Sequence, residues 1–198
     1  MNSKNKLLIY SSYLLLIFSS FFINYWSGSI GVFPIDTFLH YDSAYKILNK
    51  EIPVRDFWII HGLTVDYIQA IFFYFFGVNW HSYLIHASVF NVIITLFSFF
   101  FFNSIHLKLI YSFFLAIFIS ILAYPISGVP FIDHHSTFFS LIGLFIFWFG
   151  INKKNYSFFI IIPFLFALAF FSKPVPAAYI IVLFSVLLIT YCIKEKNY

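Results

Sequence analysis

Charged residues are scarce in this chain, and their scarcity limits the classes of protein it can belong to. Of 198 residues only 9% are charged, whereas 62% are hydrophobic. No soluble domain can bury so much apolar surface, so the composition is typical of an integral membrane protein. The single cysteine, Cys192, excludes an internal disulfide. The net charge of +4 comes without any run of basic residues, and we expect no nucleic-acid partner.

Long apolar segments predict an all-α, multi-pass helical membrane protein. No repeat, linker or low-complexity segment divides the chain, so residues 1–198 are expected to form a single membrane domain that contacts membrane lipids. Apolar segments of roughly 17–21 residues are long enough to cross the bilayer core. About six such segments are expected to span the membrane: Leu7–Ile23, Ser82–Phe102, Leu109–Ile126, Ser136–Ile151, Tyr156–Phe171 and Ala177–Ile193. Pro163 is expected to kink the fifth of them.

Residues 24–81 remain as a long loop, in which we expect two helices at the membrane interface. The apolar stretch Thr64–Phe76 is short and carries Asp66, so we predict that it lies at the interface or re-enters the bilayer. Between residues 38 and 48 apolar side chains recur at helical spacing, which predicts an amphipathic helix on the membrane surface that ends at Pro53. Its apolar side comprises Phe38, Tyr41, Tyr45 and Leu48, and its polar side His40, Asp42, Lys46 and Asn49.

The distribution of lysine predicts the orientation of the spans. If Thr64–Phe76 does not span, seven lysines fall on one side of the membrane, and three lysines with Arg55 fall on the other. The positive-inside rule places the lysine-rich side in the cytoplasm. We therefore predict a protein of the cell (inner) membrane with its N-terminus and C-terminus both cytoplasmic and the loop of residues 24–81 outside.

Three outer segments carry ionisable groups to the same face of the membrane. The first, Ile35–Gly62, holds four of the seven acids and the only arginine. The second, Pro125–His135, reads PISGVPFIDHH, and the third, Ser172–Pro176, reads SKPVP. No ionisable residue is expected near the middle of a span, which argues against a solute or lipid transporter.

A recognisable pattern runs through the first segment and ends one residue beyond it, at Asp36, Ala44, Pro53, Arg55, Asp56, Phe57, His61, Gly62 and Leu63. It resembles the first outer loop of the C-type (GT-C) superfamily of polyprenyl-phosphate-sugar-dependent glycosyltransferases, such as protein mannosyltransferases and aminoarabinose transferases. The Asp133 segment is similar to that family's second acidic loop, and Phe171–Pro174 resembles its third outer loop. Lys50 stands where the family usually has glycine. The family usually has more spans, so the chain resembles its N-terminal module only, and a second chain is a possible source of the C-terminal half.

The resemblance implies transfer of a sugar from a polyprenyl-phosphate donor to a lipid, glycan or protein acceptor. It implies that Asp36 is the catalytic base for the acceptor hydroxyl, whereas a helix N-cap is the alternative. It implies that Lys173 binds the donor phosphate, whereas an interfacial snorkelling lysine is the alternative. His134 and Arg55 are implied as further donor-phosphate ligands. Substrate-binding roles are implied for Asp133, Asp56 and His61, although Arg55 and Asp56 can also simply pair with each other.

The sequence itself requires no cofactor. Asp133, His134 and His135 are residue types that bind divalent metals, but adjacent histidines do not easily face one ion, so no metal site is assigned. His86 is expected to have a packing role. The alternative function is a non-catalytic membrane subunit, or an orphan half-enzyme, that binds a polyprenyl lipid or a partner protein.

Overall fold

The protein is built from helices, as expected from its apolar segments. The computed structural model describes residues 3–32 and 36–196, so Ile35, the first residue of the first outer segment, lies outside the described residues. Within these ranges no strand is present, and the all-α prediction is confirmed. In chain order the elements are α1 (Ser3–Ile30), α2 (Thr37–Leu48), α3 (Thr64–Phe76), α4 (Trp80–Ser104), α5 (Leu109–Leu122), η1 (Tyr124–Ile126), α6 (Ile132–Asn152), η2 (Tyr156–Ile160), α7 (Ile161–Ser172) and α8 (Pro174–Lys196).

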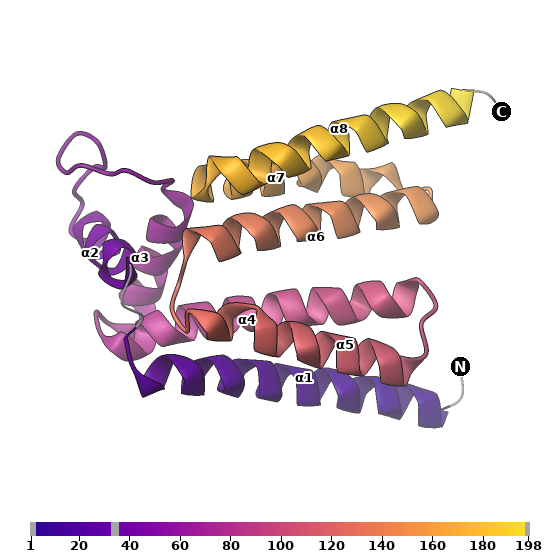
Figure 1. The fold of residues 1–198 in the computed structure, drawn as a ribbon, viewed down its shortest axis with the longest axis horizontal. Helices are drawn as coiled ribbons and strands as arrows, with labels where there is room; N and C mark the ends of the chain where they lie inside the picture. The colour runs from indigo at the N-terminus through magenta and orange to yellow at the C-terminus, as the bar shows by residue number, and fades with distance from the viewer. Residues whose placement is uncertain (1–2, 33–35, 197–198) are drawn as a thin grey trace.

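The helices other than α2 and α3 form two groups that lie side by side (Figure 1). Helices α1, α4 and α5 pack together as one group, and α6, α7 and α8 as the other. The short helices α2 and α3 lie together at one end of both groups (Figure 1). Helix α1 begins, and helix α8 ends, at the opposite end.

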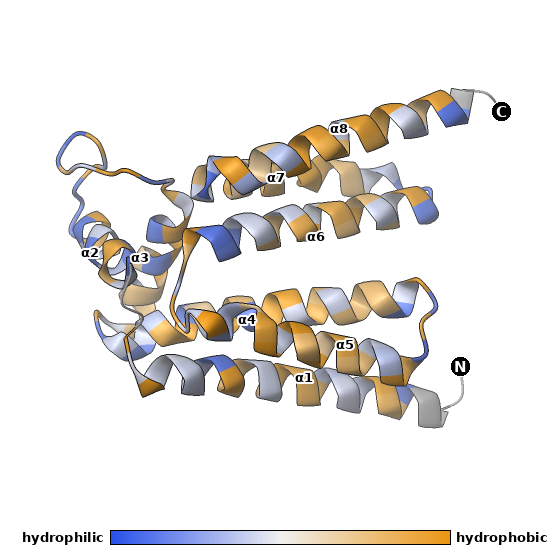
Figure 2. Ribbon diagram, viewed as in Figure 1, coloured by the Kyte–Doolittle hydropathy of each residue, from blue (hydrophilic) through white to orange (hydrophobic). Residues whose placement is uncertain are grey.

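The helices have the length and composition of membrane spans. Five of those described are long and apolar enough to cross a bilayer: α1, α4, α5 with η1, α6 and α8. The fifth expected span, Tyr156–Phe171, corresponds to the 5 residues of η2 followed by the 12 residues of α7 and is shorter. Apolar residues dominate the middle of the long helices, whereas hydrophilic residues are more frequent toward their ends and on α2 and α3 (Figure 2). The protein is therefore embedded in a membrane by its helices.

Pro163 does not interrupt a helix, contrary to the kink that the sequence predicts. It is the third residue of α7, directly after the change from the 3₁₀-helix η2 to an α-helix. Backbone N–H groups of the first helical turn have no partner within the helix, so proline is tolerated there.

Buried amide side chains hold α1, α4 and α5 together. The Asn91 side chain donates two hydrogen bonds of 2.9 Å, one to the carbonyl of Ser20 on α1 and one to that of Ser120 on α5. The Asn24 side chain on α1 donates to Ser88 Oγ on α4 at 3.0 Å. Where lipid surrounds the helices, the hydrophobic effect does not drive them together. Hydrogen bonds between helices therefore contribute to their association.

Helix α2 ends at Leu48, earlier than the sequence predicts, and Lys50 lies two residues beyond its end. The N–H of Lys50 donates to Ile47 O and the N–H of Glu51 to Lys46 O, the pair of bonds that defines a Schellman motif. The motif requires a left-handed residue, and Lys50 has a φ of 69°. This explains why glycine suits the position, because a Cβ is strained in the left-handed region.

Lys50→Gly is expected to stabilise the protein by about 0.5–1 kcal/mol, since it removes the Cβ strain but adds backbone freedom to the unfolded chain. The measurement is thermal unfolding in detergent. Lys153→Gly is the control, because Lys153 follows α6 with an ordinary φ of −88°. A lower melting temperature for Lys50→Gly, equal to that of the control, would show that the left-handed turn is unstrained.

Candidate functional site

The three outer segments selected from the sequence meet at one end of the bundle, which we call the polar end: α2, α3, residues 49–63, residues 123–135 and Lys173. The loop before α3 lies directly on the C-terminus of α7. A Cβ on Gly62 would lie 2.0 Å from Phe171 O and 2.5 Å from Ser172 O, so only glycine allows this contact. Two residues after Gly62, the Thr64 hydroxyl donates to Leu168 O, about one turn earlier on α7, at 3.1 Å. The first and third outer segments are therefore packed backbone to backbone.

Lys173 and Asp133 join the second and third segments. Lys173 Nζ donates to both carboxylate oxygens of Asp133, at 2.8 and 2.9 Å. Ser136 Oγ on the first turns of α6 donates to the Lys173 carbonyl at 2.9 Å. Both charged side chains remain partly exposed, at 37% for Lys173 and 40% for Asp133. The ammonium group is thus held in place while it stays accessible from outside the protein.

Asp36 lies at the start of α2 with its side chain exposed. Its φ is 57°, and its carboxylate makes no capping hydrogen bond to α2. The N-cap alternative therefore has no support from the side chain. The next residue is fixed instead, because the buried hydroxyl of Tyr83 on α4 donates to Thr37 O at 2.6 Å.

Arg55 and Asp56 pair with each other, one of the two roles open for them. The Arg55 guanidinium donates to both carboxylate oxygens at 2.7 and 2.8 Å, and the Ile52 N–H donates to the same carboxylate at 2.7 Å. Chiefly because of the Arg55 hydrogen bonds, the pKa of Asp56 falls from 3.8 to about 2. The pair is at the surface and contributes little to stability, but it closes the turn of residues 52–56. Arg55 is already engaged, so a phosphate would compete with Asp56 for it.

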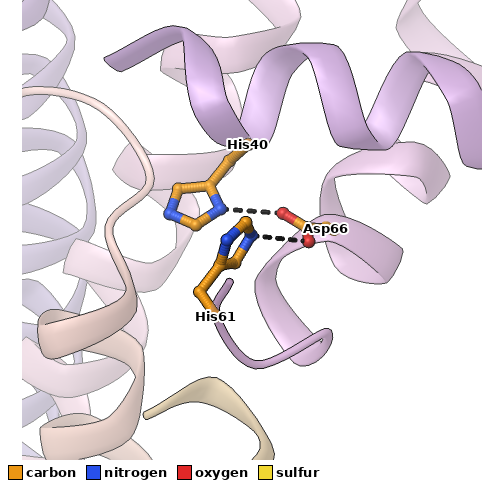
Figure 3. Close-up of side chains that lie close together, drawn as sticks. All are labelled: His40, His61 and Asp66. Atoms are coloured by element: carbon orange, nitrogen blue, oxygen red, sulfur yellow. Dashed lines mark hydrogen bonds and ion pairs between the residues drawn. The ribbon is translucent and has the colours of Figure 1, made fainter. Parts of the chain in front are cut away.

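Two histidines and one carboxylate form a cluster inside the polar end that was not predicted from the sequence (Figure 3). His40 Nδ1 on α2 donates to one oxygen of Asp66 at 2.7 Å, and His61 Nε2 donates to the other at 2.8 Å. The side chain of Asp66 is 0% exposed, that of His40 1% and that of His61 4%. The polar-face assignment of His40 is therefore wrong: α2 turns His40 toward α3 and leaves Phe38 and Tyr45 exposed.

A second buried chain of polar side chains begins one turn further along α3. His86 on α4 is bonded through Nδ1 to Gln69 Oε1 at 2.8 Å and through Nε2 to His135 Nε2 at 2.9 Å. His135 Nδ1 is in turn bonded to the hydroxyl of Tyr124. All four side chains are fully buried. The chain links α3, α4, η1 and α6, so His86 does more than fill space between helices.

Neighbouring His134 contacts this chain only through an aromatic ring. Its ring stacks on that of Tyr124, with 4.8 Å between centroids, and meets the edge of Phe131. Asp133, His134 and His135 thus point to three different sets of neighbours: Lys173, an aromatic face and a buried hydrogen-bond chain. Their side chains therefore do not converge on one point.

The comparisons with known proteins add no identification. No family model, curated protein or solved structure matches this chain. The residues at the polar end and their arrangement are therefore the basis on which a function can be proposed.

Proposed function

We propose that this chain is a glycosyltransferase module of the cell membrane that uses a polyprenyl-phosphate-linked sugar as its donor. The polar end would face the extracytoplasmic side, with both termini in the cytoplasm. The observation that supports the proposal best is the convergence of three sequence-distant segments. Gly62 lies against Phe171 and Ser172, and Lys173 is bonded to Asp133.

An apolar groove on the protein suits the donor's lipid. The groove lies between α7 and α8, has a volume of about 460 Å³, and is lined by Pro163, Phe166, Ala167, Phe170, Phe171, Ile181 and Phe184. Its lining reaches Phe171, two residues before Lys173. A polyprenyl tail lying along this groove would bring its phosphate to the lysine, where the ammonium stabilises the charge of the leaving phosphate.

Asp36 would serve as the base of the reaction. Its carboxylate is exposed and is not used for helix capping. A carboxylate in that state can accept the proton of the acceptor hydroxyl as the hydroxyl attacks the anomeric carbon. Asp133 would hold Lys173 until the phosphate arrives. Asp56, with Arg55, would keep the first loop in shape beside the sugar, while His61 would lie near it.

The test is binding and transfer with the purified chain in lipid nanodiscs, with and without a partner chain encoded beside it. Donor binding is expected to be saturable. Lys173→Ala is expected to weaken it at least about tenfold, because a hydrogen bond to a charged group contributes about 1.5–3 kcal/mol. Asp133→Asn is expected to preserve binding, since it frees the ammonium. Asp36→Asn should leave donor binding unchanged and abolish transfer.

Lys153→Ala is the matched control, because it removes the same charge from an exposed site at the opposite end of α6. Equal donor affinity for Lys173→Ala and Lys153→Ala would contradict the phosphate site. Full transfer activity of Asp36→Asn would contradict the role of base. Binding that depends on Lys173, without transfer even when the partner chain is present, would instead support the alternative of a non-catalytic subunit that holds a polyprenyl lipid.

A further inference from the structure

We propose that His40, His61 and Asp66 bind a divalent transition-metal ion of the Zn²⁺ type. One donor atom from each of the three residues lies within 4.8 Å of the others. Imidazole nitrogen and carboxylate oxygen are the ligands that such ions prefer besides thiolate. The proposal concerns metal binding alone and stands whether or not the chain transfers sugar.

The three ligands come from three parts of the polar end. His40 lies on the second turn of α2, His61 in the loop before α3, and Asp66 in the first turn of α3. The loop is fixed by the contact between Gly62 and the end of α7, and α2 is fixed by its packing on α3 through Ala44, Ala70 and Phe73. The cluster is therefore held in place by the surrounding fold, which is the preorganisation that a metal site needs.

The buried carboxylate needs a positive charge that no lysine or arginine in the described part of the chain supplies. Among the described residues, the ion-pair partners of Asp66 are the two histidines only. A carboxylate that is removed from water is costly unless a cation or a metal compensates it. A divalent ion between the two rings and the carboxylate supplies that charge.

The far ring nitrogens distinguish this cluster from the bonded pair of His86 and His135. In the described part of the chain, His40 Nε2 and His61 Nδ1 are buried without any hydrogen-bond partner. No partner occupies either far nitrogen, so when an ion replaces the hydrogen bonds to Asp66, each ring can carry its proton on the far nitrogen and present the near lone pair to the ion. His86 and His135 differ, because both nitrogens of each ring are already in hydrogen bonds.

Three protein ligands leave a coordination position for water or for an oxygen of a bound molecule. Three protein ligands with one exchangeable position are typical of reactive zinc sites, whereas structural zinc sites usually have four. The ion would also join α2, the loop and α3, since each contributes one ligand. Metal binding should therefore raise the stability of the polar end.

The probe is Co²⁺ added to the full chain in detergent after removal of metals by a chelator. We expect one equivalent to bind and to give the intense visible absorption of a cobalt ion with few ligands, and we expect Zn²⁺ to displace it. Asp66→Asn and His61→Ala are each expected to weaken binding at least about 100-fold, because even the loss of an outer partner costs 10–100-fold. His106→Asn is the control, since His106 is exposed in the α4–α5 loop.

A variant that gains an absorption band separates loss of a metal ligand from loss of folding, because an unfolded protein would not gain the band. His61→Cys, made with Cys192→Ser so that no other thiol is present, is expected to bind Co²⁺ and to show a new thiolate-to-cobalt absorption band. Helical circular dichroism would confirm that each variant is folded. The proposal is overturned if wild type binds no Co²⁺, if the folded Asp66→Asn and His106→Asn variants bind it equally, or if His61→Cys shows no thiolate band.

Discussion

Gly62→Ala is expected to lower the stability of the protein by about 3 kcal/mol or more, because its Cβ would meet backbone that cannot move aside. The nearest atoms are Phe171 O at 2.0 Å, Phe171 C at 2.5 Å and Ser172 O at 2.5 Å. The loop before α3 must therefore leave α7, and His61 must leave its position beside Asp66. The expected result is a lower melting temperature together with faster proteolysis between residues 49 and 63.

Gly31→Ala is the matched control for this substitution. A Cβ on Gly31 meets nothing within 4 Å, so the same added methyl group should leave melting and proteolysis nearly unchanged. If Gly62→Ala melted and resisted protease as wild type does, the close contact between the first and third outer segments would be wrong. The convergence that supports the proposed function would then be lost as well.

His86→Leu is expected to destabilise the protein by about 2–5 kcal/mol. The change removes two buried hydrogen bonds and leaves Gln69 Oε1 and His135 Nε2 without their partner, and each buried orphan costs about 1–3 kcal/mol. His81→Leu is the control on the same helix, because His81 is exposed and bonds only to the hydroxyl of Tyr25. Denaturant titration in detergent would measure both.

A double-substitution cycle distinguishes a hydrogen-bond chain from simple packing. Once His86 is leucine, His135→Phe should cost less than it does alone, because the bond between the two rings is already gone. The expected coupling free energy is about 1–2 kcal/mol. Strictly additive losses would show that the rings only fill space, as the sequence analysis first assumed for His86.

Hydropathy locates the long apolar helices, although with bounds that are too short, but it does not predict the face that each one buries. An 18-residue stretch of α8 has a mean hydropathy of 2.3, and only 6% of that stretch is buried. The corresponding stretch of α6 has a mean hydropathy of 1.4, and 56% of it is buried. In a lipid-embedded bundle the outward side chains are as apolar as the inward ones, so an amphipathic pattern is largely absent. The buried positions are instead marked by small and polar residues, as Asn91 and His86 show.

The composition of the candidate site was partly predictable from local sequence. Gly62, Asp133 and Lys173 stand out in the sequence because polar or flexible residues interrupt apolar segments, and the structure brings their segments together. The pairing of His40 with Asp66 was not predictable, since it depends on how α2 packs on α3. Asp66 in a short apolar stretch was a signal that it needed a buried partner.

Photo-cross-linking of a polyprenyl-phosphate sugar is the measurement that tests the central claim most directly. A light-activated group next to the phosphate would be used with the whole chain in nanodiscs, and the labelled residues would be found by mass spectrometry. We predict labelling of residues 171–176 and 59–63 that excess unlabelled donor suppresses. Labelling confined to the α4–α5 loop at the opposite end, or labelling that unlabelled donor leaves unchanged, would contradict a donor site at the polar end.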